Sequence, residues 1–215
     1  MKKFLNSEGY VILRHMVKAI QDNKVLLGDV DGLIGDGDHG MNMNKGFTTF
    51  WDRNGESNLS FSDGLFELGN VLLGEIGGSM GPIYGTIFME MSDALTDDEI
   101  GVGELASAFE AGRNGLFEII DARVGDKTLV DVLSPVCDFL RSSADNCAAL
   151  EDILSSMKAI AENGKESTKA LEAKYGRASR LGARSIGVLD AGATSCCIII
   201  QAMASGIEEI LGGAE

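Results

Sequence analysis

The sequence has few of the residues that mark linkers between domains. Only 2 of its 215 residues are proline, and no low-complexity stretch interrupts the chain. No repeat of fixed period stands out either. We therefore expect one domain spanning residues 1–215, and with 45% hydrophobic residues this length is sufficient for one large core.

Paired cysteines and long apolar runs are absent as well. The 4 cysteines lack C-x-x-C spacing, so buried free thiols are expected at Cys137, Cys147, Cys196 and Cys197 rather than disulfides or zinc. The N-terminus, MKKFLNSEGY, has no apolar run of signal-peptide length, and no uninterrupted stretch approaches the ~20 residues of a membrane span. These absences predict a cytoplasmic protein.

Basic residues are scarce relative to acidic ones. The 18 Lys and Arg against 33 Asp and Glu give a formal charge of -15, which repels nucleic acid and anionic membranes, so neither is expected as a partner. One segment nevertheless gathers six basic residues. This cluster either holds a small anion such as phosphate or forms a solvated face paired with nearby glutamates. It comprises Lys165, Lys169, Lys174, Arg177, Arg180 and Arg184.

Apolar residues recur at helical spacing along most of the chain, as at Ile12, Met16 and Ile20, while strand-like alternation is scarce. Ser7 can cap the first helix, and Pro82 and Thr128 suit the starts of the fourth and sixth. The sequence predicts an all-α protein with antiparallel neighbours where connections are short. Its eight expected helices are 7–23, 40–54, 62–76, 82–95, 104–120, 128–144, 148–173 and 193–211.

The segment from Asp31 to Asn42 reads DGLIGDGDHGMN and places three carboxylates and an imidazole among four glycines. Glycine enters positive-φ conformations without a Cβ clash, so the backbone can fold tightly enough to bring Asp31, Asp36 and Asp38 together. Converging carboxylates repel one another unless a hard cation with oxygen ligands lies between them. We interpret the segment as a Mg²⁺ site.

Three other interpretations of this segment compete with a Mg²⁺ site. The letters from Gly35 to Gly40 fit the dinucleotide fingerprint G-x-G-x-x-G, but no β-branched strand precedes them and two aspartates would repel a pyrophosphate. An EF-hand counted from Asp36 would place Phe47 where a glutamate is needed. An acidic turn with helix-capping aspartates and nothing bound remains the plainest alternative.

Glycine-rich turns precede the second, fourth, sixth and eighth expected helices. Besides the acidic segment they are Gly77-Gly78-Ser79-Met80-Gly81, Gly125-Asp126-Lys127-Thr128 and Asp190-Ala191-Gly192-Ala193-Thr194. Helix N-termini favour anions because their first N–H groups lack partners within the helix. Any one such turn is ordinary, but four together with the acidic segment and the basic cluster indicate metal-bound nucleotide phosphate.

Four blocks, in order, carry a family resemblance: GDGDHGMNMNKGF from Gly35, GGSMGPIYGTIF from Gly77, GDKTLVDVLSPV from Gly125 and GRASRLGARSIGVLDAGATS from Gly176. Together they resemble the ADP-binding L subunit of dihydroxyacetone kinase, over nearly the whole chain. The resemblance implies a single-domain eight-helix antiparallel barrel. It also implies that ADP or ATP and two Mg²⁺ ions are bound by loops at one end.

The resemblance also implies roles for individual residues. Asp31, Asp36 and Asp38 would bind the metal, and His39 and Arg177 would act on the phosphates as catalytic residues. At four positions the sequence departs from the family, with Met80 in place of a hydroxyl residue, Leu129 in place of a frequent methionine, Ala191 in place of a proline, and Val188 near a common histidine. The implied nucleotide-binding residues are His39, Gly40, Met41, Asn42, Ser79, Met80, Leu129, Arg177, Asp190, Ala191 and Gly192.

In the family the ketotriose is bound covalently to a histidine of a separate K subunit. With His15 and His39 as its only histidines, this chain offers no second site for that role. The resemblance implies a K-subunit partner, a homodimer, and an ADP that is recharged by the phosphohistidine-bearing M subunit of the phosphotransferase system. Four alternatives stay open: ATP as an exchanging substrate, erythrulose as the ketose, a nucleotide sensor that binds a transcription regulator, and a metal-binding protein without nucleotide.

Overall fold

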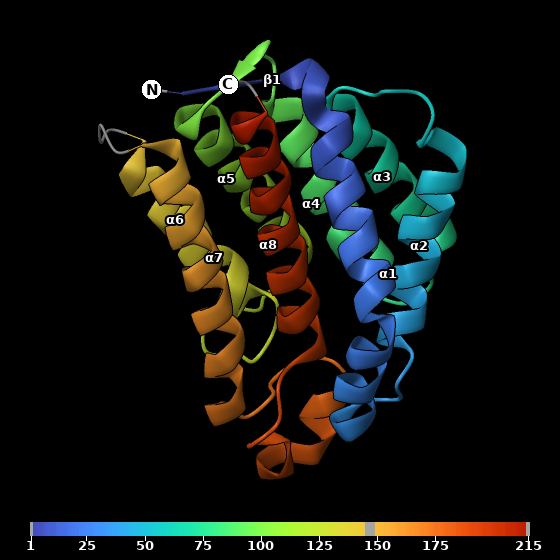
Figure 1. Ribbon diagram of the computed structural model, residues 1–215. Coiled ribbons are helices and arrows are strands. Elements are labelled where there is room, and N and C mark those ends of the chain that lie inside the picture. The colour runs from blue at the N-terminus through green and yellow to red at the C-terminus, as the bar shows by residue number, and fades with distance from the viewer. Residues whose placement is uncertain (1, 145–148, 214–215) are drawn as a thin grey trace.

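A computed structural model of the chain describes residues 2–144 and 149–213. Within these ranges eight α-helices lie side by side (Figure 1), which confirms the all-α prediction. Their bounds are Gly9–Ile34 (α1), His39–Asn54 (α2), Phe61–Glu75 (α3), Met80–Ala94 (α4), Val102–Ile119 (α5), Val130–Ser143 (α6), Leu150–Ser167 (α7) and Ala191–Gly212 (α8).

Short elements complete the chain. Two strands that were not predicted, β1 (Phe4–Leu5) and β2 (Glu99–Ile100), pair antiparallel with Phe4 opposite Ile100. Three 3₁₀ helices are also present: η1 (Asn6–Glu8), η2 (Thr168–Ala170) and η3 (Arg177–Ser185).

The eight helices form a closed antiparallel barrel. Each helix packs against the next one in the chain, and α8 packs back against α1. Short connections such as residues 35–38, between α1 and α2, force neighbouring helices to run in opposite directions. The apolar faces meet inside, as shown by the buried Ile12, Met16 and Ile20 of α1. The barrel that the resemblance implied is therefore confirmed.

Helix α8 is apolar on most sides because other helices cover it. It packs against α1, α6 and α7 and buries Ile200, Met203 and Ile207. By length and composition alone it could cross a membrane, and it is the one such helix among the described residues. The core helix of a globular protein has the same composition. Cys137, Cys196 and Cys197 are buried free thiols as predicted, whereas Cys147 lies outside the described residues.

The first helix is longer than predicted. It was expected to end at residue 23, but α1 continues to Ile34, and the buried Leu27 extends its apolar face. Gly28 is a helix residue rather than a turn residue. The connection that follows passes close to it, because a Cβ on Gly28 would be in ordinary van der Waals contact, 3.4 Å from the carbonyl oxygen of Gly37. Asp31 consequently lies on the last turn of a helix.

Two further predictions about the helices were wrong. The seventh helix was expected over 148–173, but α7 ends at Ser167, and the basic segment after it forms η3, which was not predicted. Periodicity could not reveal η3 because Ser185 is its one buried residue and Gly182, at φ 54°, interrupts it. Ser7 lies in η1, and no side-chain hydrogen bond caps α1.

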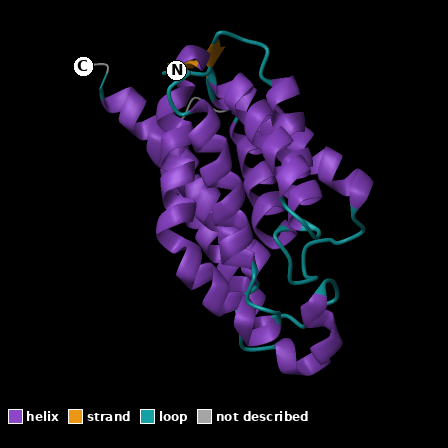
Figure 2. Ribbon diagram, turned by 90° about the vertical axis from the view of Figure 1, so that its right-hand side faces the viewer, coloured by secondary structure: helices purple, strands orange, loops and turns teal. Residues whose placement is uncertain are grey.

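Neighbouring helices alternate in direction, so α2, α4, α6 and α8 all begin at the end of the barrel where α1 finishes. This is the lower end in Figure 1, where η3 also lies. Figure 2 shows several long loops beside this end. The four glycine-rich turns, which are far apart in the sequence, therefore lie at one end of the molecule.

Candidate functional site

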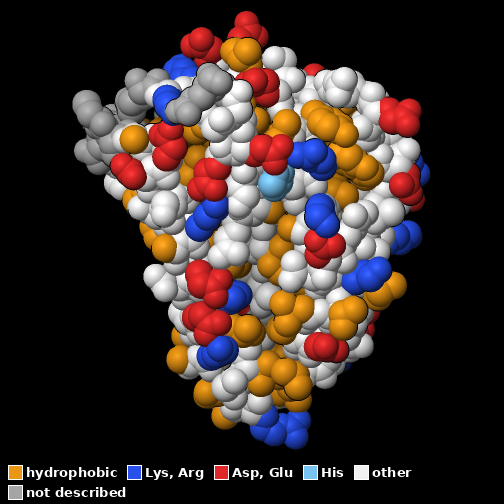
Figure 3. All heavy atoms as spheres, in the orientation of Figure 1, with side chains coloured by type: hydrophobic (Ala, Val, Ile, Leu, Met, Phe, Trp, Pro, Cys, Tyr) orange, Lys and Arg blue, Asp and Glu red, His pale blue; other side chains and the backbone are white. Residues whose placement is uncertain are grey.

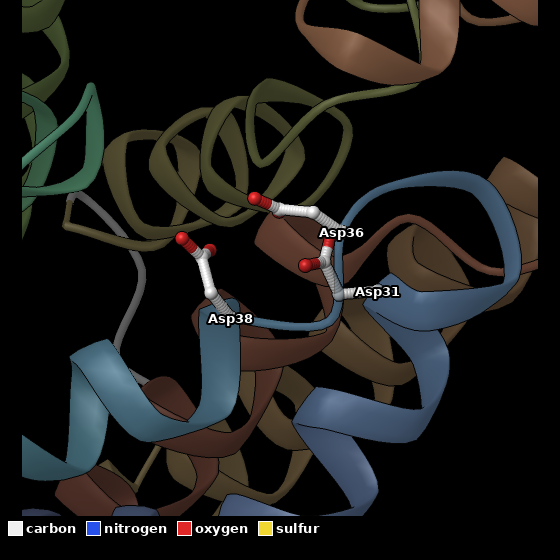
Figure 4. Close-up of side chains that lie close together, drawn as sticks. All are labelled: Asp31, Asp36 and Asp38. Atoms are coloured by element: carbon white, nitrogen blue, oxygen red, sulfur yellow. The ribbon is translucent and has the colours of Figure 1, made fainter.

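Three carboxylates converge where α1 ends and α2 begins. Asp31 lies on the last turn of α1, Asp36 lies in the connection, and Asp38 is the N-cap residue of α2. Gly37, at φ 77°, lets the connection reverse. One oxygen from each carboxylate lies within 4.8 Å of the other two, and Figure 4 shows the carboxyl groups turned toward a common space. A set of anionic oxygens fits a hard divalent cation such as Mg²⁺.

A cavity of about 360 Å³ lies beside these carboxylates, which belong to its lining. Its other walls include the apolar side chains of Ile83, Ile120 and Leu129. Tyr175 and Arg177, from the segment before and within η3, also contribute. The cavity therefore combines an apolar wall with a strongly acidic one, a composition that suits a ligand with a flat apolar part and an anionic tail bound through metal.

Four helices begin at this cavity. The residues at the starts of α2, α4, α6 and α8 that line it include Asp38, Ser79, Leu129 and Asp190. Each helix N-terminus carries a partial positive charge and N–H groups without a partner inside the helix. Their convergence favours an anionic ligand, although the three carboxylates on their own would repel one.

Arg177 connects η3 to the carboxylates. Its guanidinium forms an ion pair with Asp36, and the two side chains are 61% and 37% exposed. A pair this accessible to water contributes little to stability. Both side chains can therefore change partners when a ligand binds.

His39 is buried and belongs to a network of hydroxyl groups. Its Nε2 lies 2.8 Å from the Ser195 Oγ, which lies 2.6 Å from the hydroxyl of Tyr84. The Tyr84 hydroxyl also lies 3.1 Å from the carbonyl oxygen of Gly192. Desolvation lowers the pKa of His39 to about 4, although the charge of Asp31 acts in the opposite direction. The imidazole of the unliganded protein is therefore neutral at pH 7.

Asp190 and Lys127 organise the opposite wall. The Asp190 carboxylate caps α8 by accepting from the Ala193 N–H at 2.7 Å, and burial raises its pKa to about 6. Lys127 is 1% exposed, and its ammonium donates to the carbonyl oxygens of Thr168 and Val188, each at 2.5 Å. Burial lowers the pKa of Lys127, with Asp190 opposing the shift. Lys127 thus ties the turn before α6 to η2 and to the segment before α8.

The basic cluster divides between the surface and the cavity. Lys165 pairs with Glu162, and Lys169 with Glu166, so these lysines belong to a solvated helix face. Among the six basic residues, only Arg177 lines the cavity. Figure 3 shows Lys and Arg side chains at the lower tip of the molecule, the end at which η3 lies.

A larger depression, of about 660 Å³, lies between α1 and α8, away from this end of the barrel. Arg14 and His15 project into it, and both pair with Glu209. Its charged groups thus already have partners, and no helix start is among its lining residues. The smaller cavity is therefore the better candidate site.

The structure brings most of the predicted site residues together. Those lining the cavity are Asp31, Asp36, Asp38, His39, Ser79, Met80, Leu129, Arg177, Asp190, Ala191 and Gly192. Gly40, Met41 and Asn42, on the first turn of α2, are not among the lining residues. Gly40 instead packs on α1, where a Cβ would lie 1.9 Å from the carbonyl oxygen of Lys24.

Sequence reasoning did not assign roles to Tyr84, Lys127, Tyr175 and Ser195. Three of them line the cavity, and Ser195 lies behind His39. Tyr84 and Ser195 could have been noticed as polar residues within otherwise apolar helices. Lys127 gave no signal, because a lysine in a Gly-Asp-Lys-Thr turn is normally expected to be exposed.

Comparisons with known proteins agree with this arrangement. The DAK2 domain matches residues 33–205. The "PEP-dependent dihydroxyacetone kinase 1, ADP-binding subunit DhaL" of Listeria innocua serovar 6a is 37% identical over 86% of this chain and 88% of its own. The "PEP-dependent dihydroxyacetone kinase, ADP-binding subunit DhaL" of Escherichia coli strain K12 is 36% identical over 85% of this chain and 88% of its own.

A solved structure shares the fold. The dihydroxyacetone kinase from C. freundii, crystallised in complex with AMP-PNP and Mg²⁺, superposes with a TM-score of 0.67 at 20% identity. The match covers 95% of this chain and 35% of that one, so this chain spans about a third of that kinase's length.

Proposed function

Because the chain belongs to the DAK2 domain family, we propose that it is the nucleotide-binding subunit of a dihydroxyacetone kinase and, with its partner, a phosphotransferase. The observation that carries the proposal is the convergence of Asp31, Asp36 and Asp38 at a cavity where four helices begin. The two relatives, whose names state an ADP-binding subunit, support it. Residues 1–215 would form one nucleotide-binding domain.

Asp31, Asp36 and Asp38 would hold Mg²⁺, which neutralises phosphate charge when bound. Three carboxylates offer enough oxygens for two ions, the number that we propose. Because Asp31 and Asp38 lie on two helices that pack together, their positions are set by the barrel rather than by the connection alone. The protein's own contribution is thus to present the oxygens at a preset distance.

The remaining residues would bind the nucleotide itself. Arg177 and His39 would contact the phosphates as catalytic residues. Ser79, Met80, Gly40 and Met41 would bind phosphate through main-chain N–H groups, and Asn42, whose N–H already donates to the Asp38 carbonyl oxygen, would do so through its side chain. Leu129 would pack on the base, beside the turn formed by Asp190, Ala191 and Gly192. The apolar wall of the cavity, which includes Leu129, supports this orientation.

The substrate sugar would be held by a separate K subunit. His39 lies beside the three aspartates, where it would contact phosphate, and His15 pairs with Glu209 in the other depression, so neither is proposed to hold the ketose. The cavity end would therefore dock on that partner. We propose a ketotriose as the substrate, with erythrulose as the alternative to be assayed beside it.

For the phosphoryl donor, we propose an M subunit of the phosphotransferase system that recharges bound ADP in the cytoplasm. The word "PEP-dependent" in the names of both relatives supports this donor over free ATP. ADP retained through purification and exchanged slowly with ATP is the expected result, whereas steady turnover with ATP would contradict it. Sedimentation of the purified subunit tests the homodimer that the family resemblance implies.

The central experiment compares Asp36→Asn with wild type by calorimetric titration of ADP in the presence and absence of Mg²⁺. We expect Mg²⁺-dependent binding to weaken by at least about 10-fold, because even groups that only orient a metal ligand have effects of that size. Asp52→Asn, an equal charge change on the exposed side of α2, is the control and should bind like wild type. Unchanged binding by Asp36→Asn would contradict the proposed function.

A further inference from the structure

A chain of hydrogen-bonding groups runs from α4 through α8 to α2. Ser195 is 0% exposed and lies between His39 and Tyr84, which are 7% and 3% exposed. The two shortest contacts link Tyr84 Oη to Ser195 Oγ at 2.6 Å and Ser195 Oγ to His39 Nε2 at 2.8 Å. Both hydroxyl groups also lie 3.1 Å from the carbonyl oxygen of Gly192.

The direction of these hydrogen bonds decides which imidazole nitrogen carries the proton. Each hydroxyl group has one proton to donate. If each follows its shortest contact, Tyr84 donates to Ser195, and Ser195 donates to Nε2 of His39. The opposite direction would send a hydroxyl proton to Gly192, whose carbonyl is a longer contact and already belongs to the first turn of α8. Burial raises the pKa of Tyr84, so its hydroxyl keeps the proton that it donates.

We propose that Tyr84 and Ser195 are positioning residues that hold His39 in the tautomer with its proton on Nδ1. Nε2 is occupied by Ser195, so Nδ1 is the ring nitrogen left for a ligand of the cavity that His39 lines. A phosphate oxygen has lone pairs but no proton, so it accepts a hydrogen bond from Nδ1–H and is repelled by a bare nitrogen lone pair. The inference rests on the proposed function for the ligand, whereas the tautomer can be measured without any ligand.

The tautomer is accessible to ¹⁵N NMR because the two ring nitrogens differ in shift according to which one is protonated. The chain has only 2 histidines, so a His15→Gln variant assigns the signals of His39. In nucleotide-free wild-type protein at neutral pH we expect Nδ1 to be protonated. A proton on Nε2 instead would overturn the proposal.

We call the hydrogen-bonded chain Tyr84–Ser195–His39 the relay. Removing one of its hydroxyl groups tests whether the relay sets the tautomer of His39. Ser195→Ala should abolish the preference for Nδ1–H and weaken Mg²⁺-dependent ADP binding about 10-fold, the effect of losing one hydrogen bond to a charged group. Tyr84→Phe keeps the aromatic ring and should shift both readouts in the same direction by a smaller amount. Ser205→Ala is the matched control on α8, because the Ser205 hydroxyl bonds to its own helix at Gln201 and takes no part in the network.

Thermal unfolding establishes that each variant is folded, and Tyr84→Phe serves if Ser195→Ala does not fold. An unchanged tautomer in these variants would overturn the relay, and a changed tautomer with unchanged ADP affinity would overturn the contact with the ligand. If wild-type protein fails to bind ADP, that result contradicts both the proposed function and the proposed contact between His39 and the ligand. The NMR result still supports or overturns the relay in that case.

Discussion

At the scale of single residues, the Arg177 and Asp36 pair joins two groups that the proposed function assigns to different partners. Asp36 would bind metal and Arg177 phosphate, yet in this structure the guanidinium is paired with the carboxylate. Metal and guanidinium therefore compete for Asp36 until a phosphate gives Arg177 another anion. This competition makes the effect of one substitution depend on which ligand is present.

Arg177→Ala should tighten binding of Mg²⁺ alone by about 2–5-fold, because a solvent-exposed ion pair of up to ~1 kcal/mol no longer opposes the metal. The same variant should weaken binding of ADP with Mg²⁺ by about 10-fold or more through loss of a charge-assisted hydrogen bond. Calorimetric titrations with each ligand measure both effects.

Arg180→Ala, on the same 3₁₀ helix, removes an equal charge from a residue that does not line the cavity. It controls for long-range electrostatics and should leave both affinities near wild type. Effects of the same sign on both ligands in Arg177→Ala would rule out the competition.

Asp190 makes stability depend on pH. Its folded-state pKa of about 6 lies above the ~3.9 of an unfolded aspartate, so the folded protein binds more protons between these values. This group's contribution to stability therefore falls as pH rises from about 4 to about 6, by at most 2–3 kcal/mol in total.

Asp190→Asn should remove that component of the pH dependence, while its amide oxygen still caps α8. Urea unfolding of ligand-free wild type and variant at about pH 4.5 and about pH 7 measures the difference. The variant should gain stability relative to wild type at the higher pH. Parallel pH profiles would contradict the assignment.

At the scale of elements, glycines set how closely the helices approach one another. A Cβ on Gly206 of α8 would lie 2.6 Å from the Cα of Ile12 on α1, so the backbones of these two helices are nearly in contact. This contact closes the barrel between the last helix and the first. Neither backbone can move apart without disturbing the packing of its other neighbours.

Gly206→Ala should therefore destabilise the protein by about 1–3 kcal/mol through overpacking. Gly74→Ala, in the exposed part of α3 with nothing within 4 Å of its Cβ, should be neutral or stabilise by up to ~1 kcal/mol. Urea unfolding of the two variants compares the same chemical change in two surroundings. Equal effects would show that the α1–α8 contact is not close.

At the scale of the whole molecule, a ligand that binds across several helix ends should stabilise the entire barrel. ADP with Mg²⁺ at about 100 times its Kd should add about 2.7 kcal/mol to the free energy of unfolding by mass action. Mg²⁺ alone at the same concentration should add much less, because without the nucleotide phosphates only Asp31, Asp36 and Asp38 would hold it and its Kd would be weaker. Thermal unfolding measures this protection. Equal protection by Mg²⁺ with and without ADP would favour a metal-binding protein without nucleotide.

Local pattern made much of this protein predictable. Apolar spacing revealed the eight helices, and the glycine-rich turns marked the starts of α2, α4, α6 and α8, because both signals are carried by residues close in sequence. The clustering of Asp31, Asp36 and Asp38 was foreseeable for the same reason. The end of α1 was placed too early, and the buried Leu27 and Val30 show that its apolar face continues to the acidic segment.

What the sequence determined by itself is therefore the set of helices, the acidic segment and the family resemblance. Only the tertiary structure decided that Ser195 lies behind His39, that Lys127 is buried in the cavity wall and that Gly40 packs on α1 instead of lining the cavity. The physical reason is distance along the chain. These contacts join segments that are brought together only when the barrel closes. The spacing of residues within one segment does not predict which side chains of distant segments will be in contact.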